Sequence, residues 1–373
     1  MILDVYKEQT EHKHKYLRAY LATWFKILIS HKTITNEKYN QIIYVDSFSN
    51  AGEYTKHEKG SPLIALEIFN NILKAEKNKK LDIEVKCYFN DYDKTRVEYL
   101  EELINKESFD RRIKIKYNAI TANEHIVEVM KEIKKYSSKK ALFFIDPYSV
   151  ADDVVSLESL KLILENNDTE IIFNHMVSDV VRNIKNYPEK YETFYQLEKN
   201  TLNIPKKGKE FNDIFTNNLK KEINKEIYIA SYEFLNTKNV TIYFLVFITH
   251  HPTGYEKMKE AIWKVSDGEL YHKNTGNKNC ENLSLFSNED NTKLKQEKRA
   301  INIKNKVEDL KGILIQKFRG KEVNYEEIYE FVLKYTIFTK GHIQQKTLSP
   351  LEKEGKLIRI GTNISNSIYK FKE

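Results

Sequence analysis

Apolar residues follow two kinds of pattern along the first 176 residues of the chain. Short, almost uninterrupted apolar runs predict strands buried on both faces, and segments whose apolar residues recur every three or four positions predict helices with one apolar face. The predicted strands cover residues 42–46, 83–91, 113–119, 141–148 and 169–176, and the predicted helices cover residues 13–29, 61–75, 93–104, 121–136 and 156–166. Ser61 and Thr121 are expected to cap their helices. Buried strands that alternate with helices are typical of a parallel sheet covered on both faces.

The pattern changes after residue 176. Residues 177–225 are polar with helical spacing and are expected to form a helical insertion or lid. Two strong strands follow at 227–235 and 240–251, and the four residues between them predict an antiparallel hairpin. Five parallel strands followed by a terminal antiparallel pair are the architecture of Rossmann-like class I methyltransferases. We therefore expect an α/β domain of this type over residues 1–268.

The C-terminal part has a different order of elements. Residues 269–299 are rich in Asn, Lys, Glu and Ser and are expected to be a polar linker. Beyond it, residues 300–373 predict three helices and then two short strands, at 302–318, 325–336, 339–356, 357–361 and 367–371. This order is typical of a winged helix-turn-helix domain, whose third helix commonly enters a major groove of DNA.

The composition limits the compartment and the kinds of site that we expect for the protein. The chain has 373 residues and a formal net charge of +7, an excess that permits binding to polyanions without requiring it. Its two cysteines, Cys87 and Cys280, are too few for a disulfide framework or a thiolate zinc site and are expected to be buried thiols. No segment approaches the roughly 20 apolar residues of a membrane span, and no signal-peptide core is present at the N-terminus. We therefore expect a cytoplasmic protein.

Polar side chains stand at the ends of four consecutive predicted strands. Asp46, Asp91, Asn118 and Asp146 end the apolar runs in that order. The carboxyl ends of parallel strands meet at one edge of a sheet, where ligands of such folds bind, so we expect these side chains to surround one hollow. Asp91 can accept both hydroxyls of a ribose, and Asn118 is either a reader of an adenine edge or an ordinary turn residue. Asp93 is expected to cap the next helix.

The loops after the first and fourth strands carry the candidate chemistry. In the first loop, Gly52 and Asn50 can adopt the left-handed backbone that a close approach to a ligand requires. Asp146, Pro147 and Tyr148 end the fourth strand, where an unpaired carboxylate beside five apolar residues would be costly to bury. We therefore expect Asp146 to face a solvated cleft.

Histidines near these loops raise the question of a metal ion. His175 ends the fifth strand, and His250 and His251 follow the seventh, but their separation fits no common ligand spacing. We expect hydrogen-bonded or exposed turn histidines and no metal site. His12 and His14 lie in a basic helical run near the N-terminus and are expected to be solvated.

Six segments, together with the predicted tail, resemble the three-Cys-motif partner proteins, a bacterial family with a methyltransferase-like domain and a C-terminal winged helix. The segments span most of the chain and read HKHKYLRAYLATW (12–24), VDSFSNAGEY (45–54), GSPLIAL (60–66), YFNDYDKTRVEYL (88–100), LFFIDPY (142–148) and FITHHPTGYEKMKEAIW (247–263). The resemblance implies an S-adenosylmethionine-type fold. It also implies a separately encoded partner with a three-cysteine motif, itself similar to radical-type iron–sulfur proteins.

The motifs suggest roles for individual residues. The expected cofactor-binding residues are Asp46, Phe48, Asn50, Gly52, Asp91 and Asn118, and the expected catalytic group is Asp146, Pro147 and Tyr148. The first loop departs from the family pattern D-x-F-A-G-x-G, because Ser49 and Asn50 replace Ala and Gly and narrow the space above the loop. The motif Asp-Pro-Tyr has one proline fewer than the Asp-Pro-Pro-Tyr loop of nucleic-acid amino-methyltransferases. In those enzymes the acid holds the target amine and the aromatic ring stacks on the base.

The leading functional hypothesis is an S-adenosylmethionine-dependent methyltransferase, or a cofactor-binding relative, that acts on nucleic acid. The tail residues that can contact phosphates and bases are Lys340, His342, Gln344, Gln345, Lys346 and Arg359. Winged helices also bind proteins, so a protein-docking tail stays open. Two other classes remain: a catalytically silent scaffold or regulator that holds DNA for the partner, and a metal-dependent nucleotide-processing enzyme that uses the strand-end carboxylates.

Overall fold

The computed structural model describes residues 3–35, 41–75, 81–136, 139–151, 154–197, 205–268, 271–273 and 289–373. The chain divides into two compact units. The first comprises Met1–Met258 and Tyr271–Gly276, and the second comprises Lys259–Leu270 and Asn277–Glu373. The division falls inside helix α9 (Pro252–Ser266), ten residues before the boundary expected at 268.

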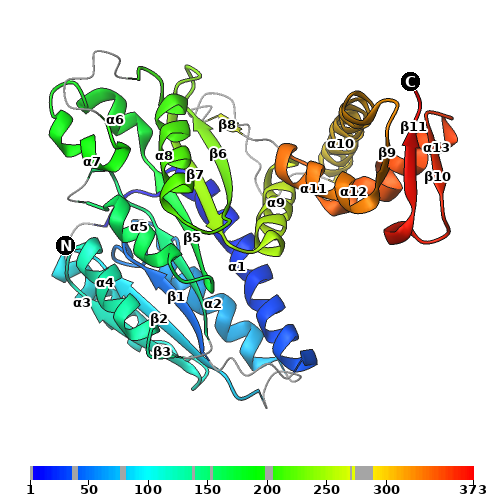
Figure 1. Ribbon diagram of the computed structural model, residues 1–373. Coiled ribbons are helices and arrows are strands. Elements are labelled where there is room, and N and C mark those ends of the chain that lie inside the picture. The colour runs from blue at the N-terminus through cyan, green and yellow to red at the C-terminus, as the bar shows by residue number, and fades with distance from the viewer. Residues whose placement is uncertain are drawn as a thin grey trace. The chain divides into compact units, whose positions relative to one another are not determined.

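An eight-stranded sheet organises the first unit (Figure 1). Its strands lie in the order β3-β2-β1-β4-β5-β7-β6-β8. Their bounds are β1 (Gln41–Asp46), β2 (Glu84–Asn90), β3 (Ile113–Asn118), β4 (Lys139–Ile145), β5 (Thr169–His175), β6 (Tyr228–Leu235), β7 (Thr241–Thr249) and β8 (Tyr271–Lys273).

The strand directions define the fold. β1 to β5 are parallel, and β7 is antiparallel to both of its neighbours, β5 and β6. A reversed seventh strand between the fifth and the sixth is the arrangement of Rossmann-like class I methyltransferases, so the predicted fold is confirmed. The short strand β8, parallel to β6, is an addition that the apolar pattern does not reveal.

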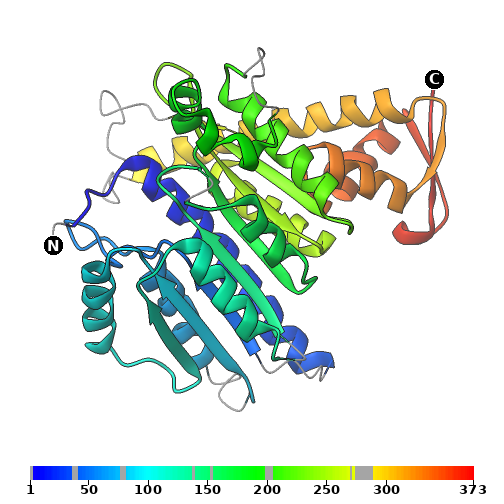
Figure 2. The same ribbon diagram turned by 60° about the vertical axis from the view of Figure 1, so that its left-hand side comes forward.

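Helices cover both faces of the sheet (Figures 1 and 2). α1 and α2 share one face, where Phe25 packs on Phe69 and Tyr20 packs on Phe247. α4, α5 and α8 lie on the other face. The helices are α1 (Glu8–Thr35), α2 (Ser61–Lys74), α3 (Lys94–Asn105), α4 (Ala122–Ile133), α5 (Leu157–Leu164), α6 (Val177–Asn183), α7 (Glu192–Tyr195), α8 (Gly208–Glu222) and α9.

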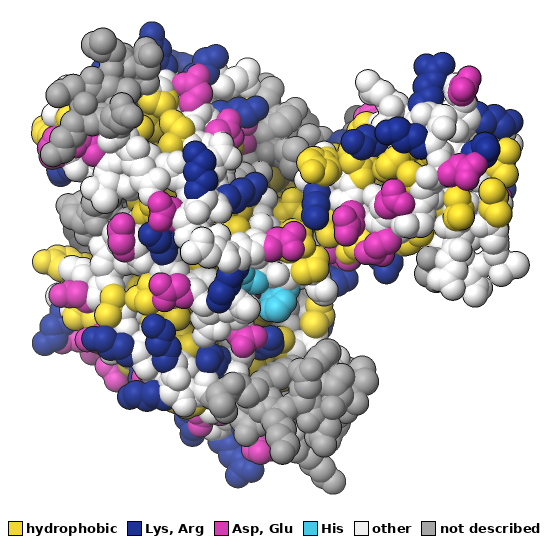
Figure 3. All heavy atoms as spheres, viewed as in Figure 1, with side chains coloured by type: hydrophobic (Ala, Val, Ile, Leu, Met, Phe, Trp, Pro, Cys, Tyr) yellow, Lys and Arg dark blue, Asp and Glu magenta, His cyan; other side chains and the backbone are white. Residues whose placement is uncertain are grey.

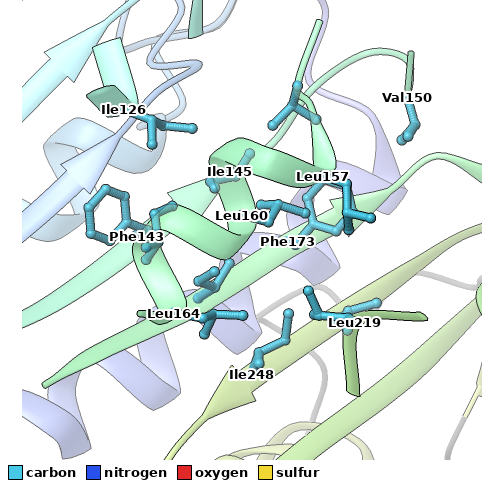
Figure 4. Close-up of a cluster of buried hydrophobic side chains, with 14 of the residues drawn as sticks. Ile126, Phe143, Ile145, Val150, Leu157, Leu160, Leu164, Phe173, Leu219 and Ile248 are labelled. Carbon is cyan, nitrogen blue, oxygen red and sulfur yellow. The ribbon is translucent and has the colours of Figure 1, made fainter. Parts of the chain in front are cut away.

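The main core fills the space between the sheet and helices α4, α5 and α8 (Figure 4). Leu160 and Leu164 of α5 meet Phe143 of β4 and Phe173 of β5 in this cluster. Phe211, Phe215 and Leu219 of α8 belong to the same cluster. The described part of 177–225 contains α6, α7 and α8, and α8 is a layer of the core. Residues 198–204 of that segment lie outside the described residues.

Local sequence sets the start of several helices. Asp93 accepts a hydrogen bond from the Thr95 N–H and caps α3, as predicted. Thr121 forms a capping box with Glu124 at the start of α4, also as predicted. The expectation for Ser61 is wrong, because Ser61 is the first residue of α2 and Gly60 takes the cap position.

The second unit contains α10 (Glu289–Phe318), β9 (Glu322–Asn324), α11 (Tyr325–Tyr335), α12 (Lys340–Ile343), α13 (Ser349–Lys353), β10 (Leu357–Ile360) and β11 (Ile368–Phe371). β10, β11 and β9 form an antiparallel sheet in that order. The predicted third helix is interrupted, because Gln344–Leu348 forms a five-residue π-helical segment between α12 and α13.

Part of the predicted linker, with one of the two cysteines, lies outside the described residues. The described residues of 269–299 form β8 and the beginning of α10, and Cys280 lies outside the described residues. Cys87 is buried, as predicted. Trp24 of α1 and Trp263 of α9 are both buried. None of the described helices is long and apolar enough to cross a lipid bilayer.

Asn90, at the end of β2, ties three loops of the carboxyl edge together. Its side-chain amide donates to the Ser47 carbonyl and to the Ile120 carbonyl, both at 3.1 Å, and its oxygen accepts from the Ile120 N–H at 3.2 Å. Asn90 is 1% exposed, so each of these bonds replaces one to water. One side chain thus fixes the loops that follow β1, β2 and β3.

We expect Asn90→Ala to lower the free energy of unfolding by roughly 2–4 kcal/mol, because it leaves buried carbonyls without donors. Asn118→Ala is the matched control. Asn118 pairs with Asn90 in the sheet register, but its amide makes only a 3.5 Å contact with Glu128. Urea denaturation measures both variants, and equal losses would contradict the role given to Asn90.

Candidate functional site

A cleft of about 430 Å³ opens at the carboxyl edge of the sheet. Six of the predicted site residues line it: Phe48, Asn50, Gly52, Asp146, Pro147 and Tyr148. Residues that the sequence did not predict as site residues complete the lining, and they include Asp4, Lys13, Glu53, Tyr54, Ser61 and Asn174. The cleft therefore lies between the loop after β1, the loop after β4 and the N-terminal segment with the first turns of α1.

The first loop has the left-handed backbone that its sequence predicts. Asn50 has φ 52° and Gly52 has φ 79°. A Cβ at Gly52 would lie 2.3 Å from Cδ1 of Leu100, so both space and conformation call for glycine. The Gly60 N–H donates to the Gly52 carbonyl at 2.7 Å, which joins the loop to the start of α2.

Asp46 lies beneath the cleft and does not line it. Its side chain is fully buried, and its Oδ1 accepts a 3.3 Å hydrogen bond from the Phe48 N–H. Oδ2 has no hydrogen-bond partner among the described residues. Burial raises the pKa of Asp46 to about 7, although the nearby Ser61 hydroxyl and the Phe48 N–H favour the charged form.

Asp91 and Asn118 do not line the cleft. Asp91 braces the first loop, because its two oxygens accept from the Asn50 N–H at 3.1 Å and from the Asp93 N–H at 3.0 Å. Burial raises the pKa of Asp91. Asn118 ends β3 at the same edge of the sheet, so the four strand-end groups share an edge but only Asp146 reaches the cleft.

Asp146 faces the cleft through an ion pair. Lys13 of α1 approaches its carboxylate to 2.6 Å, and the side-chain amide of Asn174 on β5 donates to it at 2.7 Å. Both charged side chains are mostly buried, with 10% of Lys13 and 16% of Asp146 exposed. The charge of Asp146 is thus compensated from α1, a helix that sequence reasoning placed only against the core.

Tyr148, Asn50 and Arg96 meet at Asp4. Oδ2 of Asp4 accepts from the Asn50 amide at 2.6 Å and from the Tyr148 hydroxyl at 2.7 Å, and the Arg96 guanidinium lies 3.5 Å away. Partial burial opposes ionisation of Asp4, but these hydrogen bonds and the Arg96 charge hold the pKa of Asp4 below its usual value. Burial, with the bond to Asp4, raises the pKa of Tyr148 to about 12, so its hydroxyl donates at neutral pH.

His14, His175 and His250 make hydrogen bonds within the first unit. His250 bonds the Leu164 and Glu226 carbonyls, as expected for a turn histidine. His175 bonds Tyr195 at 2.6 Å and Asn212 at 3.1 Å in the core, where burial lowers its pKa to about 4. The expectation of a solvated His14 is wrong. His14 is 4% exposed, bonds the Tyr6 hydroxyl at 3.2 Å, and burial lowers its pKa to about 3.

A second cavity, of about 330 Å³, lies at the opposite edge of the sheet, where β4 and β5 begin. Trp24 lines it, and Glu170 is buried beside it. The Tyr20 hydroxyl donates to Glu170 at 2.7 Å and the Thr249 hydroxyl donates at 2.9 Å. Burial raises the pKa of Glu170. Because its carboxylate already joins α1 to β7, we interpret Glu170 as a structural tie.

The tail residues expected to contact nucleic acid differ in exposure. Lys340, Gln345 and Lys346 are exposed, and Gln344 and Arg359 are partly exposed. The expectation that His342 is exposed is wrong. It is 7% exposed and packs on Trp263 at a ring distance of 4.3 Å, which fixes the start of the third helix to the core of the second unit.

Comparisons with known proteins carry no argument about this chain. No protein-family model and no curated protein matches the chain. Matching solved structures include protein LPL1258 of Legionella pneumophila, of the DUF519 family, at 11% identity over 70% of this chain and 93% of that chain, with a TM-score of 0.41.

Two further matches are described as methyltransferases. A proposed caffeoyl-CoA O-methyltransferase of Staphylococcus aureus is 11% identical over 60% of this chain and 81% of that chain, with a TM-score of 0.29. A proposed rRNA methylase of Clostridium thermocellum is 10% identical over 60% and 95%, with a TM-score of 0.30. The class of this protein, a Rossmann-like methyltransferase fold, follows from its own strand order.

We expect Asp46→Asn to remove a pH dependence of stability. The folded-state pKa is about 7, against about 3.9 in an unfolded chain. Between these values the native state holds a proton that the unfolded state has released, so stability falls as pH rises from about 4 to about 7, by roughly 4 kcal/mol. Urea denaturation at pH 5 and pH 8 should show a larger loss for the native protein than for Asp46→Asn.

Asp110→Asn is the control for this experiment. Its hydrogen bonds with Arg112 lower the pKa of Asp110 to about 2, so it is ionised at both pH values in the folded and the unfolded chain. Asp110→Asn should therefore change stability equally at pH 5 and pH 8. An unchanged pH dependence in Asp46→Asn would contradict the raised pKa.

Proposed function

We propose that the chain binds S-adenosylmethionine in the cleft at the carboxyl edge and is a methyltransferase, or a cofactor-binding relative of one, that acts on nucleic acid. The position of the cleft carries the proposal. The cleft lies between the left-handed loop at Asn50 and Gly52 and the Asp146-Pro147-Tyr148 motif. In an open sheet, ligands bind at the carboxyl ends of the strands where the strand order changes direction, which here is between β1 and β4.

The residues of the cleft suit the amino-acid end of this cofactor. Asn174 Oδ1 in the lining is a buried acceptor without a partner among the described residues, and it suits an amino group. Asn50, Arg96 and Tyr148 supply donors for a carboxylate. The volume lies in the range of small-molecule sites. Asp91 would serve the nucleoside end from outside the present lining.

The chemistry needs little acid–base help from the protein. Bound S-adenosylmethionine supplies a methyl group on a sulfonium that is a good leaving group, so the protein contributes mainly by positioning. Asp146 offers acceptor oxygens for the N–H of a target amine, and Tyr148, which is 69% exposed, offers a ring face for stacking on an extruded base. Lys13 already binds Asp146, so the amine would use the remaining lone pairs of that carboxylate.

The two alternative functions differ in the support they have. Among the described residues no three His, Cys, Asp or Glu side chains are grouped so that they could hold a metal ion, so the geometry does not favour a metal-dependent nucleotide-processing enzyme. The silent scaffold is favoured by one observation, which is that Asp4 of the chain itself binds Asn50 and Tyr148 in the lining of the cleft.

The second unit is the proposed nucleic-acid-binding module. Its support is the order of its helices and its β10–β11 hairpin, which is the order of a winged helix, together with the exposed side chains of Lys340 and Lys346. On the face shown in Figure 3, basic and acidic side chains are interspersed, so binding would depend on local contacts. The three-Cys-motif protein is proposed as the partner on the sequence resemblance alone.

Calorimetric titration with S-adenosylmethionine tests the cofactor proposal. We expect saturable binding, and we expect Asp91→Ala to weaken it at least tenfold, because the loop and the ribose contact are lost together. Glu98→Ala is the control, since it removes an exposed carboxylate of α3 that pairs with Lys94, and it should change affinity less than twofold. No binding to the native protein would move the conclusion to the silent scaffold.

Salt-dependent binding to duplex DNA tests the second unit. We expect Lys340→Ala with Lys346→Ala to make the slope of log affinity against log salt less steep by about 2, one for each lost phosphate contact. Lys220→Ala with Lys221→Ala removes the same charge from exposed positions of α8 and should leave the slope unchanged. Equal effects of the two pairs would indicate only a general charge effect, and no retention at low salt would indicate a protein-docking tail.

A further inference from the structure

Three side chains from three segments of the carboxyl edge converge on one carboxylate. Asn50 lies in the loop after β1, Arg96 lies on α3 after β2, and Tyr148 lies in the loop after β4. All three contact Oδ2 of Asp4, at 2.6, 3.5 and 2.7 Å respectively. An amide, a guanidinium and a hydroxyl that point at one oxygen are the donor set with which proteins recognise a ligand carboxylate.

The donors hold each other in place without Asp4. Arg96 donates to the Asn50 side-chain oxygen at 3.0 Å, which turns the Asn50 amide nitrogen towards Asp4. The Ala51 N–H donates to the same oxygen at 2.7 Å, and the Asn50 N–H is held by Asp91 at 3.1 Å. The site is therefore organised before a carboxylate enters it, which lowers the cost of binding one.

Asp4 belongs to a segment, residues 3–7, that has few attachments to the rest of the unit. The Thr55 N–H donates to the Asp4 carbonyl at 3.1 Å. The Tyr6 ring packs against Tyr54 at 4.9 Å, and the Tyr6 hydroxyl bonds His14 at 3.2 Å. Val5, between them, is 65% exposed. A segment with so few buried contacts can open locally at small cost.

We propose that Asn50, Arg96 and Tyr148 form a binding site for the carboxylate of a small ligand, and that Asp4 occupies this site as an internal competitor until the ligand displaces it. Only the identity of the ligand, the amino-acid end of S-adenosylmethionine or its product, rests on the proposed function. The position at which the family pattern has glycine is Asn50 here, and its side chain is the one that binds Asp4. The departure in the first loop thus supplies a donor of the site.

The competition has a measurable size. A competitor reduces apparent affinity by the fraction of time for which the site is open. If Asp4 fills the site about nine tenths of the time, its removal tightens binding about tenfold.

Two probes that differ at the amino-acid end test the proposal in the full chain. Asp4→Ala should bind S-adenosylhomocysteine about tenfold more tightly than the native protein and should bind 5′-methylthioadenosine, which lacks the carboxylate, with unchanged affinity. Glu11→Ala is the matched control, because it removes a carboxylate from α1 that pairs with Lys15 and does not contact the site. If Asp4→Ala and the native protein bind S-adenosylhomocysteine with the same measurable affinity, the proposal that Asp4 competes for the site is overturned. The cofactor proposal would then stand.

A second measurement decides the inference even if no adenosyl compound binds. Amide hydrogen exchange at Thr55, whose N–H is bonded to the Asp4 carbonyl, reports release of the segment. In the native protein, L-methionine should accelerate this exchange, and methioninol, its analogue without the carboxylate, should not. Arg96→Ala should abolish the difference between the two probes. The same exchange rate with L-methionine and with methioninol would overturn the proposal, whatever the outcome with the cofactor.

Discussion

The direction of the strands is the constraint on which the site depends. β1 to β5 are parallel, so their carboxyl ends all reach one edge, and each loop there must satisfy its backbone groups without a neighbouring strand. Asn90 meets much of this requirement for three loops at once. The same hydrogen-bond network that satisfies the backbone groups at this edge of the sheet also holds the functional groups of the cleft.

Much of the fold can be predicted from the sequence because buried residues recur at regular intervals along strands and helices. The five apolar runs became β1 to β5, the hairpin became β6 and β7, and Asp93 and Thr121 cap the helices that they were expected to cap. Strands β8 and β9 are three residues long, which is too short for a recurring apolar pattern. The π-helical interruption of the third tail helix is likewise absent from the apolar pattern, which remains helical through it.

The site can be predicted from the sequence only in part. Strand ends and glycine positions mark the loops, so Asn50, Gly52, Asp146 and Tyr148 were found. Whether a strand-end carboxylate faces the cleft, lies beneath it or braces a loop depends on side-chain direction, and Asp46 and Asp91 look alike in the sequence. Lys13 and Asp4 were missed because their partners lie more than 130 and 40 positions away in the sequence, respectively. The only signal for Lys13 was an unusual basic run at the start of an apolar helix.

Helix α1 is fastened at both edges of the sheet. Lys13 binds Asp146 at the carboxyl edge, and Tyr20, seven residues or about 10 Å further along the helix axis, binds Glu170 at the amino edge. A helix held at two such points cannot slide or rotate without breaking both. Any opening of the cleft on this side is therefore confined to residues 3–7. Such a displacement falls on the nanosecond to microsecond scale of loop motions, and the dimensions of the unit would stay almost constant while it occurs.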